Sequence, residues 1–248
     1  MSQVCYIYDG SFEGLLTAIY EAYYTNEKPD FILLKANYQE NLLAKKIVIQ
    51  ADCSKADKVY ASIANKISYN ALRKVYYVFA SEIPEAGTMI YQYLKLGWKM
   101  GKEVDLHLSE QKVLDVHTVS KKVSREKDRM LGLIRFRKIK GNIYYAPIEP
   151  DYNIVGLIAS HFVRRFNDQY FIIHDVRRSI AVVYNKSEWI ISEFISNQAV
   201  ALDNDESNIQ NLWKQFFESI AIKDRINPKL QKQYMPKRYW KHLIEKQG

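Results

Sequence analysis

Short apolar runs in the first part of the chain predict buried strands. Residues 4–8 and 46–50 are the clearest of these runs, and residues 31–34 predict a further short strand. Helical segments follow each of them. We therefore expect a strand–helix–strand arrangement followed by helices, in which a small parallel pair of strands is covered by helices.

Between and after these runs, apolar residues recur every three or four positions, as they do on the buried face of a helix. Ser11 is expected to cap the first helix, because its hydroxyl can accept a hydrogen bond from a free backbone N–H. Asp52 or Ser54 is expected to cap the next one. Two more helices are predicted, one over residues 72–79 and one after Pro84.

The second part begins with a helix from Ser109 and continues in a different pattern, with alternating apolar and polar positions. Lys140-Gly141-Asn142 predicts a tight turn between two strands. A final helix is expected after Asp203–Asp205 and is expected to stop at Asn227-Pro228. The central elements are expected in the order ββαβββ at residues 131–139, 142–147, 154–166, 170–174, 179–184 and 188–194.

The sequence thus predicts the α+β class: an N-terminal α/β-helical part, then one antiparallel ββαβββ sheet with C-terminal helices. We place the parts at residues 1–108 and 109–248, and one continuous domain is the alternative. Charge supports this division. Residues 1–108 hold 12 Lys and Arg against 12 Asp and Glu, whereas residues 109–248 hold 24 against 16, so the second part carries the whole surplus of +8.

A basic, aromatic second part favours a polyanion partner, because phosphates are bound by guanidinium and ammonium groups, and bases stack on aromatic rings. A solvated surface that happens to be basic is the alternative. Arg135 and Arg137, expected on one face of a strand, are the first choice for phosphate contacts. The full set of expected nucleic-acid-binding residues is Arg125, Arg129, Arg135, Arg137, Lys138, Tyr145, Arg164, Arg165, Arg177 and Arg178.

The glycine-containing turn at residues 9–14 is a candidate anion site, formed by Gly10, Ser11 and Phe12 at a helix N-terminus. It lacks the Gly-Lys-Ser/Thr ending of a phosphate-binding P-loop. A simple capped turn is the alternative, in which Gly10 supplies an unusual backbone angle.

Candidate catalytic residues are few, and the sequence does not identify a reaction. Asp9, Glu13 and Asp175 are acidic residues near strand ends, and His161 lies near the basic region. Together with Asp52, the carboxylates could gather around a metal ion, although their spacing does not require it, and we expect no metal. Asp175 could also pair with an arginine in the sequence Asp-Val-Arg-Arg.

Only two cysteines are present, Cys5 and Cys53, and both are expected to be buried free thiols. Two cysteines cannot supply the ligands of a zinc knuckle or an iron–sulfur cluster, and no cofactor is expected. No apolar run approaches the ~20 residues that span a bilayer, and the chain begins directly on a strand pattern, so we expect a cytoplasmic protein without membrane contact.

Four segments are distinctive in combination: YDGSFEGLLTAIYEAY, RFRKIKGNIYYAPIEPDYNIVGLIASHFVRRF, FIIHDVRR and NPKLQKQYMPKRYWKHLIE. In these segments, and over nearly its full length, the chain resembles a bacterial family of unknown function labelled "probable DNA metabolism protein". Members of that family usually accompany a radical SAM protein assigned to DNA modification or repair. In some bacteria a similar domain is fused to a uracil-DNA glycosylase-like domain.

The resemblance implies a DNA-associated accessory protein that works with a radical SAM partner, but it transfers no catalytic residues. Two alternatives remain open. One is an enzyme that processes nucleotides or nucleic acid with a carboxylate site around Asp9. The other is a scaffold for the partner without DNA binding. The C-terminal MPKRYWKHLIE could dock that partner or pack on its own domain.

Overall fold

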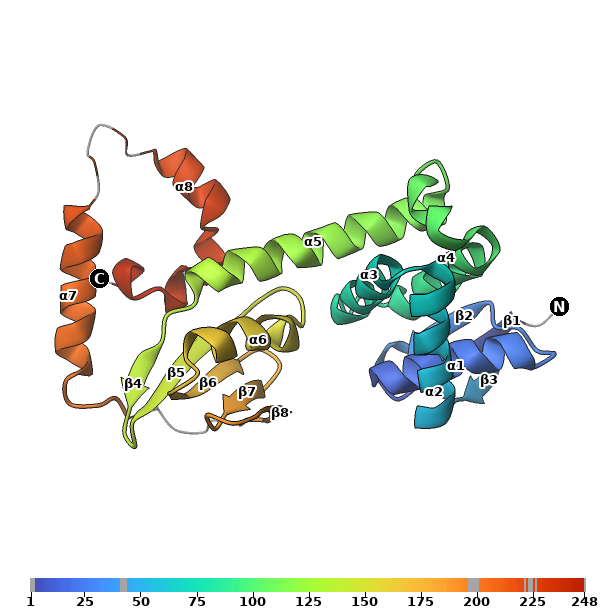
Figure 1. The fold of residues 1–248 in the computed structure, drawn as a ribbon, viewed down its shortest axis with the longest axis horizontal. Coiled ribbons are helices and arrows are strands. Elements are labelled where there is room, and N and C mark those ends of the chain that lie inside the picture. Colours follow the sequence, from blue (N-terminus) through green and yellow to red (C-terminus); the bar gives the residue numbers. More distant parts are fainter. Residues whose placement is uncertain are drawn as a thin grey trace. The chain divides into compact units, whose positions relative to one another are not determined.

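Two β-sheets, one in each half of the chain, organise the fold (Figure 1). The computed structural model describes residues 3–40, 44–195, 201–220, 222, 225 and 227–247. The chain divides into two compact units, Met1–Ser124 and Arg125–Gly248. Within the described ranges, no helix combines the length and apolar character needed to cross a membrane.

The first unit contains a parallel sheet of three strands, in the order β2-β1-β3. The strands are β1 (Gln3–Tyr8), β2 (Phe31–Leu34) and β3 (Ala44–Val48). The expected parallel pairing is therefore present, with β2 joined as a third strand. Tyr6, in the central strand, lies between Ile32 and Ile47.

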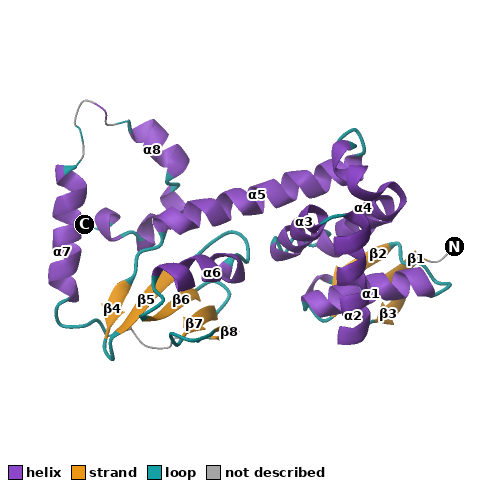
Figure 2. Ribbon diagram, in the orientation of Figure 1, coloured by secondary structure: helices purple, strands orange, loops and turns teal. Residues whose placement is uncertain are grey.

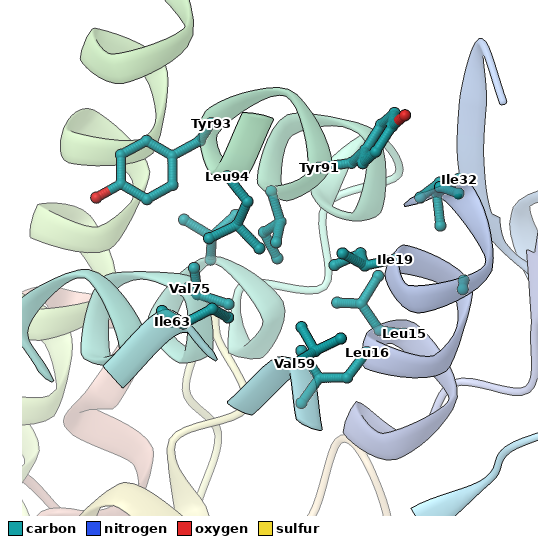
Figure 3. Close-up of a cluster of buried hydrophobic side chains, with 14 of the residues drawn as sticks. Leu15, Leu16, Ile19, Ile32, Val59, Ile63, Val75, Tyr91, Tyr93 and Leu94 are labelled. Atoms are coloured by element: carbon teal, nitrogen blue, oxygen red, sulfur yellow. The ribbon is translucent and has the colours of Figure 1, made fainter. Parts of the chain in front are cut away.

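Helices pack on this sheet and on one another, and a single apolar cluster unites them (Figures 2 and 3). Leu15 and Ile19 contribute from the first helix, Ile63 and Val75 from the next ones, and Leu94 from a later one. The helical elements are α1 (Phe12–Tyr24), η1 (Lys35–Asn37), α2 (Cys53–Ser62), η2 (Ile63–Ile67), α3 (Tyr69–Ala80), α4 (Ala86–Met100) and η3 (Gly101–Leu106).

Helix α4 lies against the edge strand β2 at unusually close range. The hydroxyl of Thr88 accepts a hydrogen bond from the backbone N–H of Ile32 at 2.9 Å, and so satisfies a donor that has no further strand to pair with. A Cβ atom on Gly87 would lie 2.5 Å from the carbonyl oxygen of Ile32. Gly87 and Thr88 together therefore allow α4 to cover the exposed edge of β2.

Helix α5 (Gln111–Leu133) belongs to both units, because the division at Ser124 and Arg125 falls inside it. It continues into residues 131–133, so the strand predicted over residues 131–139 is shorter than expected and begins only at Arg137. The helical turns of α5 compete successfully here with the alternating pattern, since Met130 and Ile134 are both buried.

The second unit contains a sheet of five strands in the order β4-β5-β6-β7-β8. The predicted ββαβββ order is confirmed. The sheet was expected to be antiparallel throughout, but it is mixed, because β5 and β6 run parallel while the other neighbours run antiparallel. The cause is α6 (Val155–Arg165), the crossover helix between β5 and β6, which returns the chain to the end of the sheet where β5 begins. The strands are β4 (Arg137–Ile139), β5 (Ile143–Ile148), β6 (Tyr170–Asp175), β7 (Ile180–Tyr184) and β8 (Trp189–Glu193).

Helix α6 covers one face of this sheet through aromatic contacts (Figure 1). The ring of Phe136 lies 5.3 Å from that of Phe162 and 4.8 Å from that of Phe166. Phe171, on β6, is fully buried beneath them. The apolar stripe of the predicted helix is therefore the face that meets the sheet.

The C-terminal region contains α7 (Glu206–Ser219), α8 (Pro228–Tyr234), η5 (Lys237–His242) and η6 (Ile244–Lys246). The final helix, expected to stop at Asn227-Pro228, ends at Ser219 instead. The Asn227 side chain accepts a hydrogen bond from the N–H of Leu230, so these residues begin α8. Cys53 also differs from expectation, because it is exposed at the start of α2, whereas Cys5 is buried.

Substitutions at the seal between α4 and β2 should destabilise the first unit. We expect Thr88→Val to cost about 1–3 kcal/mol, because the N–H of Ile32 loses its partner. Gly87→Ala should cost a similar amount, because backbone atoms must move apart. Urea denaturation followed by circular dichroism measures both. Gly132→Ala is the control, since a Cβ atom there meets nothing within 4 Å, and it should stabilise the protein slightly.

Candidate functional site

The turn at residues 9–14 is closed by its own side chains. One carboxylate oxygen of Asp9 accepts hydrogen bonds from the N–H of Ser11 at 2.9 Å and from its hydroxyl at 2.7 Å. The Ser11 hydroxyl accepts a hydrogen bond from the N–H of Gly14 at 2.9 Å, which confirms it as the N-cap. Gly10 has φ of +104°. The anion at this helix N-terminus is thus Asp9 itself.

Asp9 and Gly14 fit together because glycine has no side chain. A Cβ atom on Gly14 would collide with the Asp9 carboxylate. The features that suggested an anion site therefore match the simple capped turn, which was the alternative. Phe12 packs its ring against Tyr76 and Phe79, at 5.2 and 5.1 Å, and contributes to the apolar cluster.

The candidate catalytic residues are divided between the two units. Asp9 and Glu13 belong to the first unit, whereas Asp175 and His161 belong to the second. Asp9 lines a cavity of about 510 Å³ at the ends of the strands, together with Lys35 and Lys46. Among the described residues, no three His, Cys, Asp or Glu side chains gather where they could hold a metal ion.

Arg135 does not project from a strand face, as the sequence suggested. Its guanidinium donates to the carboxylate of Glu245 at 2.7 and 3.2 Å and to the carbonyl of Gly132 at 2.9 Å. It also lies over the ring of Trp213, at 5.3 Å. The Glu245 side chain is fully buried. Arg135, whose side chain is 18% exposed, is therefore the counter-ion of a buried carboxylate rather than an open phosphate ligand.

Arg137, Lys138 and Tyr145 are likewise less open than expected. The Nε of Arg137 is buried and has no hydrogen-bond partner in the part of the chain that the structure describes. Lys138 lies 3.8 Å from Asp203. Tyr145 is buried, and its hydroxyl lies 2.8 Å from Nδ1 of His174. His174 is buried as well, which lowers its pKa, and neither ring of this pair is open to stack on a base.

Arg178 and Asp175 form a buried pair that holds a loop. The carboxylate of Asp175 is fully buried and accepts hydrogen bonds from the guanidinium of Arg178 at 2.8 Å and from two backbone N–H groups. The same guanidinium donates to the carbonyls of Pro150 and Asp151, at 3.1 and 2.9 Å. The predicted pairing of Asp175 with an arginine is present.

Glu126, on helix α5, also binds this loop through hydrogen bonds. Its carboxylate accepts hydrogen bonds from the N–H groups of Asp151 and Tyr152, at 2.8 and 2.9 Å, and from the hydroxyl of Tyr239. Arg238 pairs with the carboxylate of Asp151 at 2.8 Å. MPKRYWKHLIE therefore packs on its own unit. The sequence pattern missed Glu126, because a buried glutamate on a charged helix looks like a solvated one.

The remaining predicted cations lie at the surface. Arg125, Arg164, Arg165 and Arg177 are exposed, and their guanidinium groups make no ion pair with any described residue. Arg129 is half-buried on the same helix as Arg125. His161 is also half-buried, with its ring against Phe162 at 5.0 Å.

The first unit also contains a cluster of polar side chains around Asp105, which the sequence pattern did not predict. The carboxylate of Asp105 accepts hydrogen bonds from Lys74 at 2.8 Å, Asn70 at 3.1 Å and Tyr93 at 2.8 Å, and lies 2.9 Å from Nε2 of His117. Burial opposes ionisation of Asp105, but these hydrogen bonds outweigh it and hold its pKa below the usual value. The partners come from three helices, so no local spacing could reveal them.

Comparison with known families gives one match. Residues 84–245 match the model of a family described as a domain of unknown function (DUF4130). The chain belongs to this family. No curated protein matches the chain.

The residues matched by the DUF4130 family model run from just before α4 into η6. They include Glu126, the loop that it holds, the Asp175–Arg178 pair and the Arg135–Glu245 pair. The Asp9 turn lies outside them. The family region thus contains the buried ion pairs of the second unit and its exposed arginines.

The Arg135–Glu245 pair predicts a pH-dependent stability. Burial opposes ionisation of Glu245, but the hydrogen bond from Arg135 outweighs it and lowers the pKa of this carboxyl below 4.5. The pair therefore stabilises the folded state fully above about pH 4.5, and its contribution is lost as pH falls through the lowered pKa. Glu245→Gln should cost about 3–5 kcal/mol at pH 7, because the mostly buried Arg135 is left without its counter-ion.

Chemical denaturation of the wild type and of Glu245→Gln across pH 3–7 measures this contribution. The difference between the two should shrink at the acid end of the range. The control is Glu27→Gln, which removes a carboxylate from the half-exposed pair with Lys45 and should change stability by less than about 1 kcal/mol. A cost for Glu245→Gln that does not change with pH would contradict the assignment.

Proposed function

We propose that the protein binds nucleic acid through its second unit, as an accessory protein of DNA metabolism. The observation that carries the proposal is the set of exposed arginines without ion pairs: Arg125, Arg164, Arg165 and Arg177. Arg135 and Arg178, in contrast, each have a carboxylate partner inside the protein. An arginine that the protein leaves without a counter-ion is available to an external anion.

Two features favour nucleic acid over a merely solvated basic surface. The whole charge surplus of the chain lies in residues 109–248. Tyr170 is 43% exposed in this basic unit, and the ammonium group of Lys186 lies 4.5 Å from its ring centre, so an exposed aromatic side chain and a cation lie together where a base and its phosphate could bind. The resemblance to proteins labelled for DNA metabolism favours DNA as the polyanion.

The same resemblance suggests a radical SAM protein as the partner, and α7 offers a surface for it. Ile209, Leu212 and Phe216 recur along one stripe of this helix, and each is more than half exposed, at 51%, 64% and 53%. A stripe of this kind fits an apolar groove on another protein. Since the η5 and η6 segment is occupied with its own unit, α7 replaces it as the docking surface in this proposal.

The two alternatives receive less support. The Asp9 carboxylate binds Ser11 in its own turn, and the Asp175 carboxylate binds Arg178. A reaction centred on these carboxylates would therefore have to use groups that already stabilise the fold. A scaffold without DNA binding would leave the exposed arginines without a role. Salt-dependent affinity for DNA separates this scaffold from the leading proposal.

Reversing the exposed charges should weaken DNA binding without unfolding the protein. We expect Arg164→Glu with Arg165→Glu to lower duplex affinity at least about tenfold at low salt. The dependence of affinity on salt should also decrease, by about 0.9 in log–log slope for each phosphate that the variant no longer binds. Fluorescence anisotropy with a labelled duplex measures both.

The matched control for this charge reversal is Lys28→Glu with Lys102→Glu, which changes the net charge equally on the first unit. It should leave the affinity nearly unchanged. A wild-type protein without salt-sensitive affinity for duplex or single-stranded DNA would overturn the proposal and leave the scaffold. Arg135→Glu is not a suitable test, because its main effect should be loss of folding.

Polar substitution on α7 should separate partner binding from DNA binding. Leu212→Asp with Phe216→Asp should abolish co-purification with the radical SAM partner and leave duplex affinity unchanged, because both side chains point away from the core. Tyr69→Asp, which changes an aromatic residue of the first unit that is 73% exposed, is the control. Unchanged co-purification of the α7 variant would exclude this helix as the docking surface.

A further inference from the structure

The first unit contains an aromatic cavity that the Asp9 turn and the basic second unit do not explain. Helices α1, α2 and α4 and the segment η2 surround it, and its volume is about 230 Å³. Its lining residues are Ile19, Tyr20, Tyr23, Tyr24, Lys58, Val59, Ser62, Lys66 and Trp98. Four of the nine are aromatic, although such side chains normally close a core rather than leave a cavity open.

The rings are held in place by one another and by a hydrogen bond. Tyr20 and Tyr24 stack with centroids 4.4 Å apart, and Tyr23 meets Trp98 edge-to-face at 4.8 Å. The indole N–H of Trp98 donates to the hydroxyl of Ser62 at 2.9 Å. Tyr24 is nonetheless 75% exposed and Tyr23 44% exposed. The cavity thus presents preformed aromatic faces to solvent.

Its charge is positive. Lys58 and Lys66 are exposed, and neither pairs with a carboxylate among the described residues. The nearby Lys55 is neutralised, since it bonds Glu21 at 2.6 Å. Asp and Glu are missing from the nine lining residues. Lys66 belongs to η2, a π-helical segment between α2 and α3, and such segments often occur at functional sites.

These properties select the class of ligand. An aromatic cage binds quaternary ammonium groups in many proteins, but two unpaired lysines would repel a cation. The volume is below the ~300–1,000 Å³ of pockets for drug-sized ligands, so the cavity can enclose one planar ring system. Aromatic rings with adjacent cations are the combination that binds a base and its phosphate.

We propose that this cavity binds a single nucleobase by stacking against its tyrosine and tryptophan rings, while Lys58 and Lys66 contact the attached phosphate. The base can belong to a free nucleotide or to an unpaired position of a single strand. The site lies within residues 1–108, whose overall charge is balanced, so net charge could not reveal it. It does not depend on duplex binding by the second unit.

Isothermal titration calorimetry with the whole chain tests the proposal. The probes are AMP, ribose 5-phosphate and a short single-stranded oligodeoxynucleotide. The wild type should bind AMP, the oligonucleotide or both, and should bind the base-free ribose 5-phosphate at least about tenfold more weakly. Binding of AMP alone identifies a nucleotide site, and binding of the oligonucleotide alone identifies a single-strand site.

Two variants locate the binding. Tyr24→Ala removes an exposed stacking face, and Lys66→Glu reverses the charge beside it, so each should weaken binding about tenfold. The matched controls are Tyr69→Ala and Lys102→Glu, which are exposed in the same unit but do not line the cavity. They should leave the affinity unchanged.

Three results would overturn the proposal: no binding of AMP or oligonucleotide, equal binding of ribose 5-phosphate, or equally weakened binding in the control variants. Arg164→Glu with Arg165→Glu should leave AMP affinity unchanged while it weakens duplex binding. Failure of the cavity is thus distinguishable from failure of the basic surface.

Discussion

The second unit depends on neutralising carboxylates that it has removed from water. Glu126, Asp175 and the side chain of Glu245 are buried, and each would be strongly destabilising without partners. The partners are backbone N–H groups, the Tyr239 hydroxyl and the guanidinium groups of Arg135 and Arg178. This requirement decides which arginines belong to the interior, and therefore which ones remain for an external ligand.

The order of elements was largely predictable from sequence, because it depends on local periodicity and caps. Ser11 and Asp52 cap the helices that the pattern assigned to them, and the β-strands of the second unit occur in the predicted order. The parallel pairing of β5 and β6 was not predictable in the same way. It depends on where α6 delivers the chain, and an antiparallel sheet would show the same alternation.

The candidate site was harder to predict than the fold, since its chemistry depends on contacts between distant residues. Arg135 and Glu245 are 110 positions apart, so nothing near Arg135 in the sequence shows that its charge is neutralised. Tyr20 and Trp98 had helical spacing typical of a core, and only the packing shows that they line a cavity. The exposed arginines, in contrast, have no ion-pair partner among the described residues, so their place at the surface depends on no distant contact, and their binding of nucleic acid stays a prediction.

The contacts of residues 237–246 also constrain how the protein is made. Tyr239 donates a hydrogen bond to Glu126, and Glu245 neutralises Arg135, so both internal charges depend on a segment that follows the five-stranded sheet in the chain. A nascent chain that has emerged only through α7 already contains the five-stranded sheet but lacks these two partners. The second unit therefore cannot neutralise these two charges until residues 237–246 have also left the ribosome.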